Sequence, residues 1–192
     1  MTACFRMEEA LMYYQQLGYG YGVAYSLHNL GLIALNQGNV ERAKPYYEQG
    51  QALFHELGNK FGIASSHLYF GYLAMLEGND AWAQILFEQA LALAPEVGPK
   101  WLSALCIARL AGVTAVRGQP IQAVKLWAAA EVLLAARASY MDSADRIYYE
   151  RIIAPACVGI SEETLEAVRA EGRAMSLEKA ISYALQVVHE GA

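Results

Sequence analysis

The sequence predicts an all-α protein, a right-handed solenoid of helical hairpins with a period of about 40 residues. Two observations predict this fold class. The chain aligns with itself when it is shifted by the spacing from Gly38 to Gly78, which is the sign of a repeat architecture. Within each unit, apolar residues recur at the three- and four-residue spacing of an amphipathic helix. The composition agrees, because 56% of the 192 residues are hydrophobic and 17% are charged, which excludes a disordered chain.

The residues that coincide at this shift are of the kinds that end helices or let helices pack closely. Glycine ends a helix at no steric cost, because it has no Cβ. Small residues allow two helix backbones to approach, and an aromatic side chain fills the space beside them. The coincident sets are Gly38, Gly78 and Gly118; Gly18, Gly58 and Gly98; Gly31, Gly71 and Ala111; Ala43, Ala83 and Ala123; and Tyr47, Phe87 and Trp127.

The first complete unit shows how each hairpin is expected to form. Leu27, Leu30 and Ala34 lie on one face of a first helix. Gly38 is expected to end this helix, and Asn39 is suited to cap the second one. The same pattern predicts complete hairpins at about residues 22–58, 62–98 and 102–138.

The chain is expected to open on half a hairpin. Ala3 and Met7 stand one period before Ala43 and Tyr47, so residues 1–20 are expected to form a second helix without its first. Terminal repeats normally carry a polar outer face. The open face therefore favours a piece of a longer protein, and the alternative is a face that binds something, such as a second copy in a homodimer.

Beyond residue 138 the period is lost, although three more helices are expected. Ser161 and Ser176 each precede early acidic residues, which is typical of helix starts. We expect residues 1–138 to form the repeat array. We expect residues 139–192 to form a C-terminal helical cap over the last hydrophobic face.

The residues that recur in the repeat units match the pattern of a known family. The pair Leu30-Gly31, Ala43 twelve residues after the glycine, Tyr47 four residues later and Pro95 at the end of the second unit resemble the tetratricopeptide repeat. The resemblance covers residues 1 to about 138. That family has a period of about 34 residues, and the longer unit here resembles repeats of large bacterial signal-transduction ATPases and of maltose-regulator-type transcriptional regulators. The segment from Tyr148 onward resembles the C-terminal tail of the same proteins.

This resemblance implies a non-catalytic scaffold that binds a protein or a peptide. In the favoured interpretation the chain is the C-terminal sensor or interaction region of a larger bacterial transcriptional regulator or signalling ATPase. The alternative is a free-standing cytoplasmic adaptor or peptide sensor that forms a homodimer through its N-terminal helix.

The family pattern also implies a groove. In tetratricopeptide arrays the first helix of each hairpin lines the concave surface, where peptides lie. Tyr25 and Leu105 replace the lysines with which chaperone adaptors of the family clamp a terminal carboxylate, so an apolar peptide or a partner helix is expected instead. The alternative is that these side chains cover an idle surface. The implied groove residues are Tyr25, His28, Asn29, Leu32, Asn36, Ser65, Tyr69, Tyr72, Met75 and Arg109.

Other classes of function lack a motif. Three dispersed cysteines and four histidines without a ligand spacing predict no disulfide framework and no metal site. The glycines at 18–22 lack the lysine and hydroxyl residue of a phosphate-binding loop. A net charge of −5 disfavours direct binding of nucleic acid, and the chain has no apolar run of about 18 residues for a membrane span. We expect a cytoplasmic protein without a cofactor.

Overall fold

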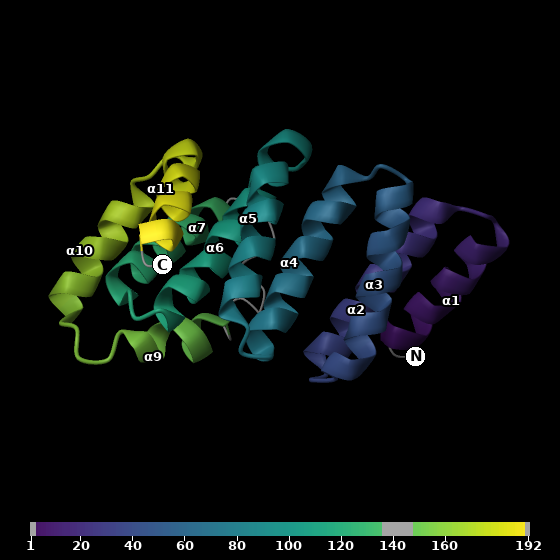
Figure 1. The fold of residues 1–192 in the computed structure, drawn as a ribbon, viewed down its shortest axis with the longest axis horizontal. Helices are drawn as coiled ribbons and strands as arrows, with labels where there is room; N and C mark the ends of the chain where they lie inside the picture. Colours follow the sequence, from purple (N-terminus) through teal and green to yellow (C-terminus); the bar gives the residue numbers. More distant parts are fainter. Residues whose placement is uncertain (1–2, 136–147, 191–192) are drawn as a thin grey trace.

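The computed structural model describes residues 3–135 and 148–190 (Figure 1). These ranges contain helices and turns and no strand. The first seven helices are α1 (Ala3–Gln16), α2 (Gly20–Asn36), α3 (Val40–Glu56), α4 (Lys60–Leu76), α5 (Asp80–Val97), α6 (Lys100–Val116) and α7 (Pro120–Ala135). The C-terminal part adds the π-helix η1 (Tyr149–Ile153), the short α9 (Ala154–Ala156), α10 (Glu162–Arg173) and α11 (Leu177–Glu190).

The N-terminal helices form a row of hairpins. Helix α2 packs on α3, α4 on α5 and α6 on α7, and each hairpin contacts the next through its second helix. The row runs from α1 at one end of the molecule to α10 at the other (Figure 1). The predicted all-α solenoid of helical hairpins is confirmed.

The helix ends are set by the residues that the sequence indicated. Gly38 has a φ of +75°, a left-handed value that disfavours any side chain. The side-chain oxygen of Asn39 accepts a hydrogen bond from the backbone N–H of Arg42 at 3.0 Å. Asn79 caps α5 in the same way. These contacts satisfy backbone donors that have no partner inside the helix.

Within the hairpins, a glycine of the first helix lies against an aromatic ring of the second. A Cβ at Gly31 would come within 2.7 Å of Cε1 of Tyr47, and a Cβ at Gly71 would clash with the ring of Phe87. Both rings are fully buried. The two glycines therefore make room for the rings between the paired helices.

Between hairpins, a second set of contacts repeats. Phe54 of α3 lies against Gly62 of α4, where a Cβ would clash with its ring. Tyr14 of α1 lies against Gly22 of α2 in the same way, one period earlier in the chain. Helix α1 thus docks on α2 as α3 docks on α4.

The C-terminal helices surround the last hairpin. Helix α10 packs on α7, and only a glycine at position 172 fits against the backbone of Lys125. Helix α11 packs on α6 and α7, where Nη1 of Arg117 donates to the carbonyl oxygen of Val188 at 3.0 Å. Because η1 covers another side of α6, 12 of the 17 residues of that helix are buried.

The expected starts of two C-terminal helices are confirmed. Ser161 Oγ accepts a hydrogen bond from the backbone N–H of Thr164 at 3.2 Å, and Ser176 Oγ accepts one from Lys179 at the same distance. The boundary that we expect between array and cap, at residues 138 and 139, lies outside the described residues.

Candidate binding face

The expected groove residues come from α2, α4 and α6, and they differ in exposure. Tyr25 is 38% exposed, and Asn29 and Asn36 are also exposed on α2. Leu32 is half-buried. The remaining half-buried members are Ser65, Tyr69, Tyr72 and Met75 on α4 and Arg109 on α6.

His28 does not lie where the family pattern implies. It is 7% exposed, and its ring centroid lies 4.7 Å from that of Tyr69 and 5.2 Å from that of Tyr47. Burial lowers the pKa of His28 to about 4, so the ring is neutral at pH 7. We correct this expectation: position 28 faces the junction of α2, α3 and α4, where aromatic rings close over it, and His28 belongs to the core.

Tyr25 marks the junction of the first two hairpins. Its hydroxyl oxygen accepts a hydrogen bond from Nδ2 of Asn59 at 3.2 Å. Its ring meets Phe54 edge-on, with centroids 5.0 Å apart. Asn59 also caps α4 by accepting from the backbone N–H of Gly62 at 2.9 Å. These contacts hold an exposed aromatic side chain in one orientation at the start of α2.

Three of the expected groove residues contact the C-terminal segment. The hydroxyl of Tyr148 donates to the carbonyl oxygen of Arg109 at 3.1 Å and lies 3.2 Å from the sulfur of Met75. The Arg109 guanidinium lies 4.2 Å from the ring centroid of Tyr148 and 5.6 Å from that of Tyr72. Tyr148 is 2% exposed. Tyr72 also contacts Tyr148, with ring centroids 5.9 Å apart, so these side chains of α4 and α6 hold a part of the chain itself.

A hollow of about 480 Å³ lies between α1 and the start of α2. The rings of Tyr14 and Tyr19 have centroids 5.6 Å apart, and those of Tyr19 and Tyr21 are 6.3 Å apart. The described residues that line this hollow are uncharged, so it suits apolar groups with a few hydrogen-bonding partners. The residues that line the hollow are Met7, Ala10, Tyr14, Tyr19, Tyr21, Gly22, Tyr25, Ser26, Asn29 and Asn59.

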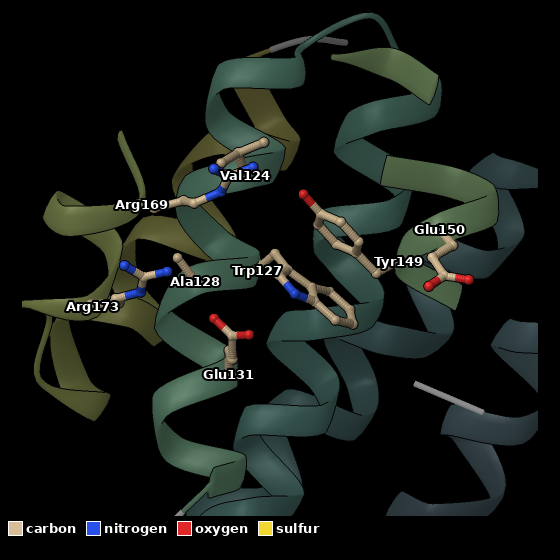
Figure 2. A pocket seen from close by; sticks show the side chains of 8 residues that line it. All are labelled: Val124, Trp127, Ala128, Glu131, Tyr149, Glu150, Arg169 and Arg173. Carbon is tan, nitrogen blue, oxygen red and sulfur yellow. The ribbon is translucent and has the colours of Figure 1, made fainter. Parts of the chain in front are cut away.

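A second hollow, of about 340 Å³, lies between α7, η1 and α10 (Figure 2). The rings of Trp127 and Tyr149, with centroids 5.1 Å apart, form one wall, and Arg169 and Arg173 enter from α10. Arg169 pairs with two glutamates of its own helix at 2.6 and 2.7 Å, and Arg173 pairs with Glu166 at 3.7 Å. Because both cations already have anionic partners, this hollow does not select for an anion, and we assign it no ligand.

Cys106 is fully buried in the core. Burial raises the pKa of the Cys106 thiol, which keeps it protonated. Among the described residues, no group of three or more His, Cys, Asp or Glu side chains could hold a metal ion. In the same ranges no helix is long and apolar enough to cross a membrane.

Comparison with protein families gives one match. Residues 24–53 match the model of the tetratricopeptide repeat, and this range covers most of α2 and α3. The searches of curated proteins and of solved structures found no match. The first complete hairpin is thus similar to a tetratricopeptide repeat, and it lies in a row of similar hairpins.

Proposed function

We propose that this protein is a scaffold that binds a peptide or a partner protein along the concave side of its first two hairpins. Solenoids of this kind typically present such extended concave surfaces to other proteins. The observation that carries the proposal is a contrast along the row of first helices. Asn29 and Asn36 of α2 are exposed, whereas Arg109 of α6 lies under Tyr148.

The partner is expected to be apolar and weakly charged on its contact surface. Helix α2 carries no acidic or basic residue other than the neutral, buried His28. Its exposed side chains offer amide groups and the ring of Tyr25. Because apolar contacts and hydrogen bonds to amides carry little net charge, the affinity for such a partner is expected to change little with ionic strength.

We also propose that the chain is one region of a larger protein. The long repeat unit and the C-terminal segment support the sensor or interaction region of a larger bacterial transcriptional regulator or signalling ATPase, in the cytoplasm. A second candidate is an adaptor that forms a homodimer through α1. It is favoured by the exposed apolar side chains of that helix, where Met12 is 60%, Tyr13 65% and Phe5 45% exposed.

The test uses random peptides displayed on phage, selected on the immobilised chain. Selected peptides are then measured against a double variant, Leu32→Arg with Asn36→Arg, which places two cations on the concave side. The matched control is Gln89→Arg with Ala92→Arg, two exposed positions on α5. We expect the concave variant to weaken binding by about tenfold or more, equivalent to about 1.4 kcal/mol.

The control variant is expected to bind like the original protein. The proposal is wrong if no peptide is enriched, or if the two double variants weaken binding equally. Circular dichroism of both variants checks that each keeps its helices.

A further inference from the structure

We infer that Tyr148 is an internal competitor for the concave side, and that a partner peptide displaces it with a tyrosine of its own. The place that Tyr148 occupies, called the Tyr148 slot below, is formed by Tyr72 and Met75 of α4 and by Arg109 and Gly112 of α6. The inference rests on the proposed function, because it concerns the regulation of the same surface and the chemistry of the same partner.

The Tyr148 slot recognises an aromatic ring that carries a hydroxyl group. The guanidinium of Arg109 lies 4.2 Å from the ring centroid of Tyr148, where a cation is attracted to the face of a ring. The hydroxyl donates to the carbonyl oxygen of Arg109 at 3.1 Å and lies 3.2 Å from the sulfur of Met75. The slot therefore contacts both parts of a tyrosine side chain, whereas a phenylalanine leaves the carbonyl oxygen without this donor.

Position 112 distinguishes the third hairpin from the first two. A Cβ at Gly112 would collide with the hydroxyl of Tyr148. One and two periods earlier the equivalent positions are Tyr72 and Leu32, which carry large side chains. Of the three first helices, α6 thus has the residue that leaves room for an inserted ring.

The Tyr148 slot continues the concave row of the first two hairpins. Tyr72 stands one period after Leu32. Arg109 stands two periods after the exposed Asn29. A peptide that runs from α2 along the concave side therefore reaches Tyr72, whose ring centroid lies 5.9 Å from that of Tyr148. The peptide and Tyr148 compete for the same contacts.

The segment that carries Tyr148 is held by few buried side chains. Of residues 148–157, Tyr148, Ile153 and Cys157 are buried, and the others are half-buried or exposed. The segment contains the π-helix η1, a rare conformation that is frequent at functional sites. Helices α10 and α11 pack on α7 and α6 by contacts of their own. A local opening therefore frees the slot while α10 and α11 stay docked.

This competition gives binding a sign that general destabilisation does not have. A peptide enters the slot only in the molecules from which Tyr148 has left, so its apparent affinity is reduced by the fraction of open molecules. A substitution that weakens the hold of Tyr148 therefore strengthens binding of the peptide. A substitution that merely loosens the fold does not.

The first experiment selects random peptides on phage against Tyr148→Ala, and in parallel against Tyr148→Ala combined with Gly112→Leu. We expect a tyrosine at a fixed position in the peptides from the first selection. We expect none from the second, because the leucine fills the vacated slot. Circular dichroism checks that both variants keep their helices.

The second experiment measures one tyrosine peptide against the original chain and Tyr148→Phe. This variant keeps the ring and loses the hydrogen bond to Arg109, so we expect about fivefold tighter binding, equivalent to about 1 kcal/mol. Tyr148→Ala is expected to bind about tenfold tighter or more. Tyr46→Phe is the matched control, because Tyr46 is half-buried on α3, outside the slot, and it is expected to leave the affinity unchanged.

Variants of the peptide test the chemistry of the slot. Replacing its tyrosine by phenylalanine is expected to weaken binding about fivefold, because the hydrogen bond to the carbonyl oxygen of Arg109 is lost. Phosphotyrosine is expected to weaken binding about tenfold or more. Its phosphate would face that carbonyl oxygen, another acceptor, where Gly112 leaves room for a hydroxyl.

The inference is overturned if the peptides enriched on Tyr148→Ala carry no tyrosine, or if the double variant enriches the same tyrosine. It is also overturned if the peptide binds Tyr148→Phe and the original chain equally. The proposed function is judged separately by Leu32→Arg with Asn36→Arg. If that variant weakens binding and the Tyr148 variants do not change it, the proposed function stands and this inference fails.

Discussion

The hydroxyl of Tyr148 occupies the space that a side chain at Gly112 would need. Position 112 therefore has to be glycine for the C-terminal segment to close onto α6. The same hydroxyl donates to the carbonyl oxygen of Arg109 at 3.1 Å. Because Tyr148 also lies 3.2 Å from the sulfur of Met75 on α4, it covers groove positions of the third hairpin and the end of the second, whereas Asn29 and Asn36 on α2 stay exposed.

Tyr148→Phe tests this closure. The substitution keeps the ring but leaves the Arg109 carbonyl oxygen without this donor, so we expect a loss of about 1 kcal/mol in the free energy of unfolding. Urea titration measures it. Tyr13→Phe is the control, because Tyr13 is 65% exposed and the change there is expected to be negligible. Equal effects of the two substitutions would contradict the closure.

Gly31→Leu and Gly38→Ala test the hairpin packing. Leucine at 31 collides with the buried ring of Tyr47, and overpacking of this kind costs about 2–3 kcal/mol. Gly38 has no atom within 4 Å of its Cβ position, and its φ of +75° makes alanine unfavourable by about 1 kcal/mol. The urea midpoint of Gly31→Leu should be the lower one. Equal midpoints would argue against the close approach of α2 to α3.

Trp127→Ala tests the packing of the last hairpin. The side chain is 5% exposed and stacks on Tyr148 with centroids 6.3 Å apart. Removing a large buried aromatic side chain costs about 3–5 kcal/mol. Trp82→Ala is the matched control, since Trp82 is 48% exposed and surface changes stay within about 0.5 kcal/mol. A loss below about 1 kcal/mol for Trp127→Ala would show that its packing is misassigned.

His28 makes stability depend on pH. Its pKa is about 4 in the folded chain against 6.5 when unfolded, because burial disfavours the charged ring. The unfolded state therefore binds more protons between these values, and stability is lost as the pH falls from about 6.5 to about 4. Between pH 7 and pH 5 this group accounts for a loss of about 2 kcal/mol.

The comparison with His28→Leu isolates this contribution. Unfolding of both proteins is measured in urea at pH 7 and pH 5. The variant is expected to lose about 2 kcal/mol less than the original over this interval. His67, whose pKa burial also lowers, stays the same in both proteins and cancels. Identical pH dependence of the two proteins would show that His28 is not buried as a neutral ring.

The hairpins could be predicted because their packing repeats. The contacts of Gly31 with Tyr47 and of Gly71 with Phe87 follow one geometry, so the same residue types return at one spacing. The cap of α3 could also be predicted, because Asn39 acts on a backbone N–H only three residues away. Local and periodic contacts leave a signal in a single sequence.

Tyr148 could not be placed in this way. It contacts Arg109 and Met75, 39 and 73 residues earlier, through tertiary contacts outside the repeat. His28 was misplaced by the family pattern, although the repeat carried a signal for its burial. One and two periods later the equivalent positions are Leu68 and Ala108, which are buried as His28 is.

The central claim is that partners bind on the concave side of the first two hairpins. Photo-cross-linking in the native host tests it most directly, with a benzophenone amino acid placed at Asn36 in one strain and at Gln89 in another. Both positions are exposed, on α2 and α5 respectively. The account predicts a discrete cross-linked partner from position 36 and none from position 89. Cross-linking from position 89 alone, or equally from both, would contradict it.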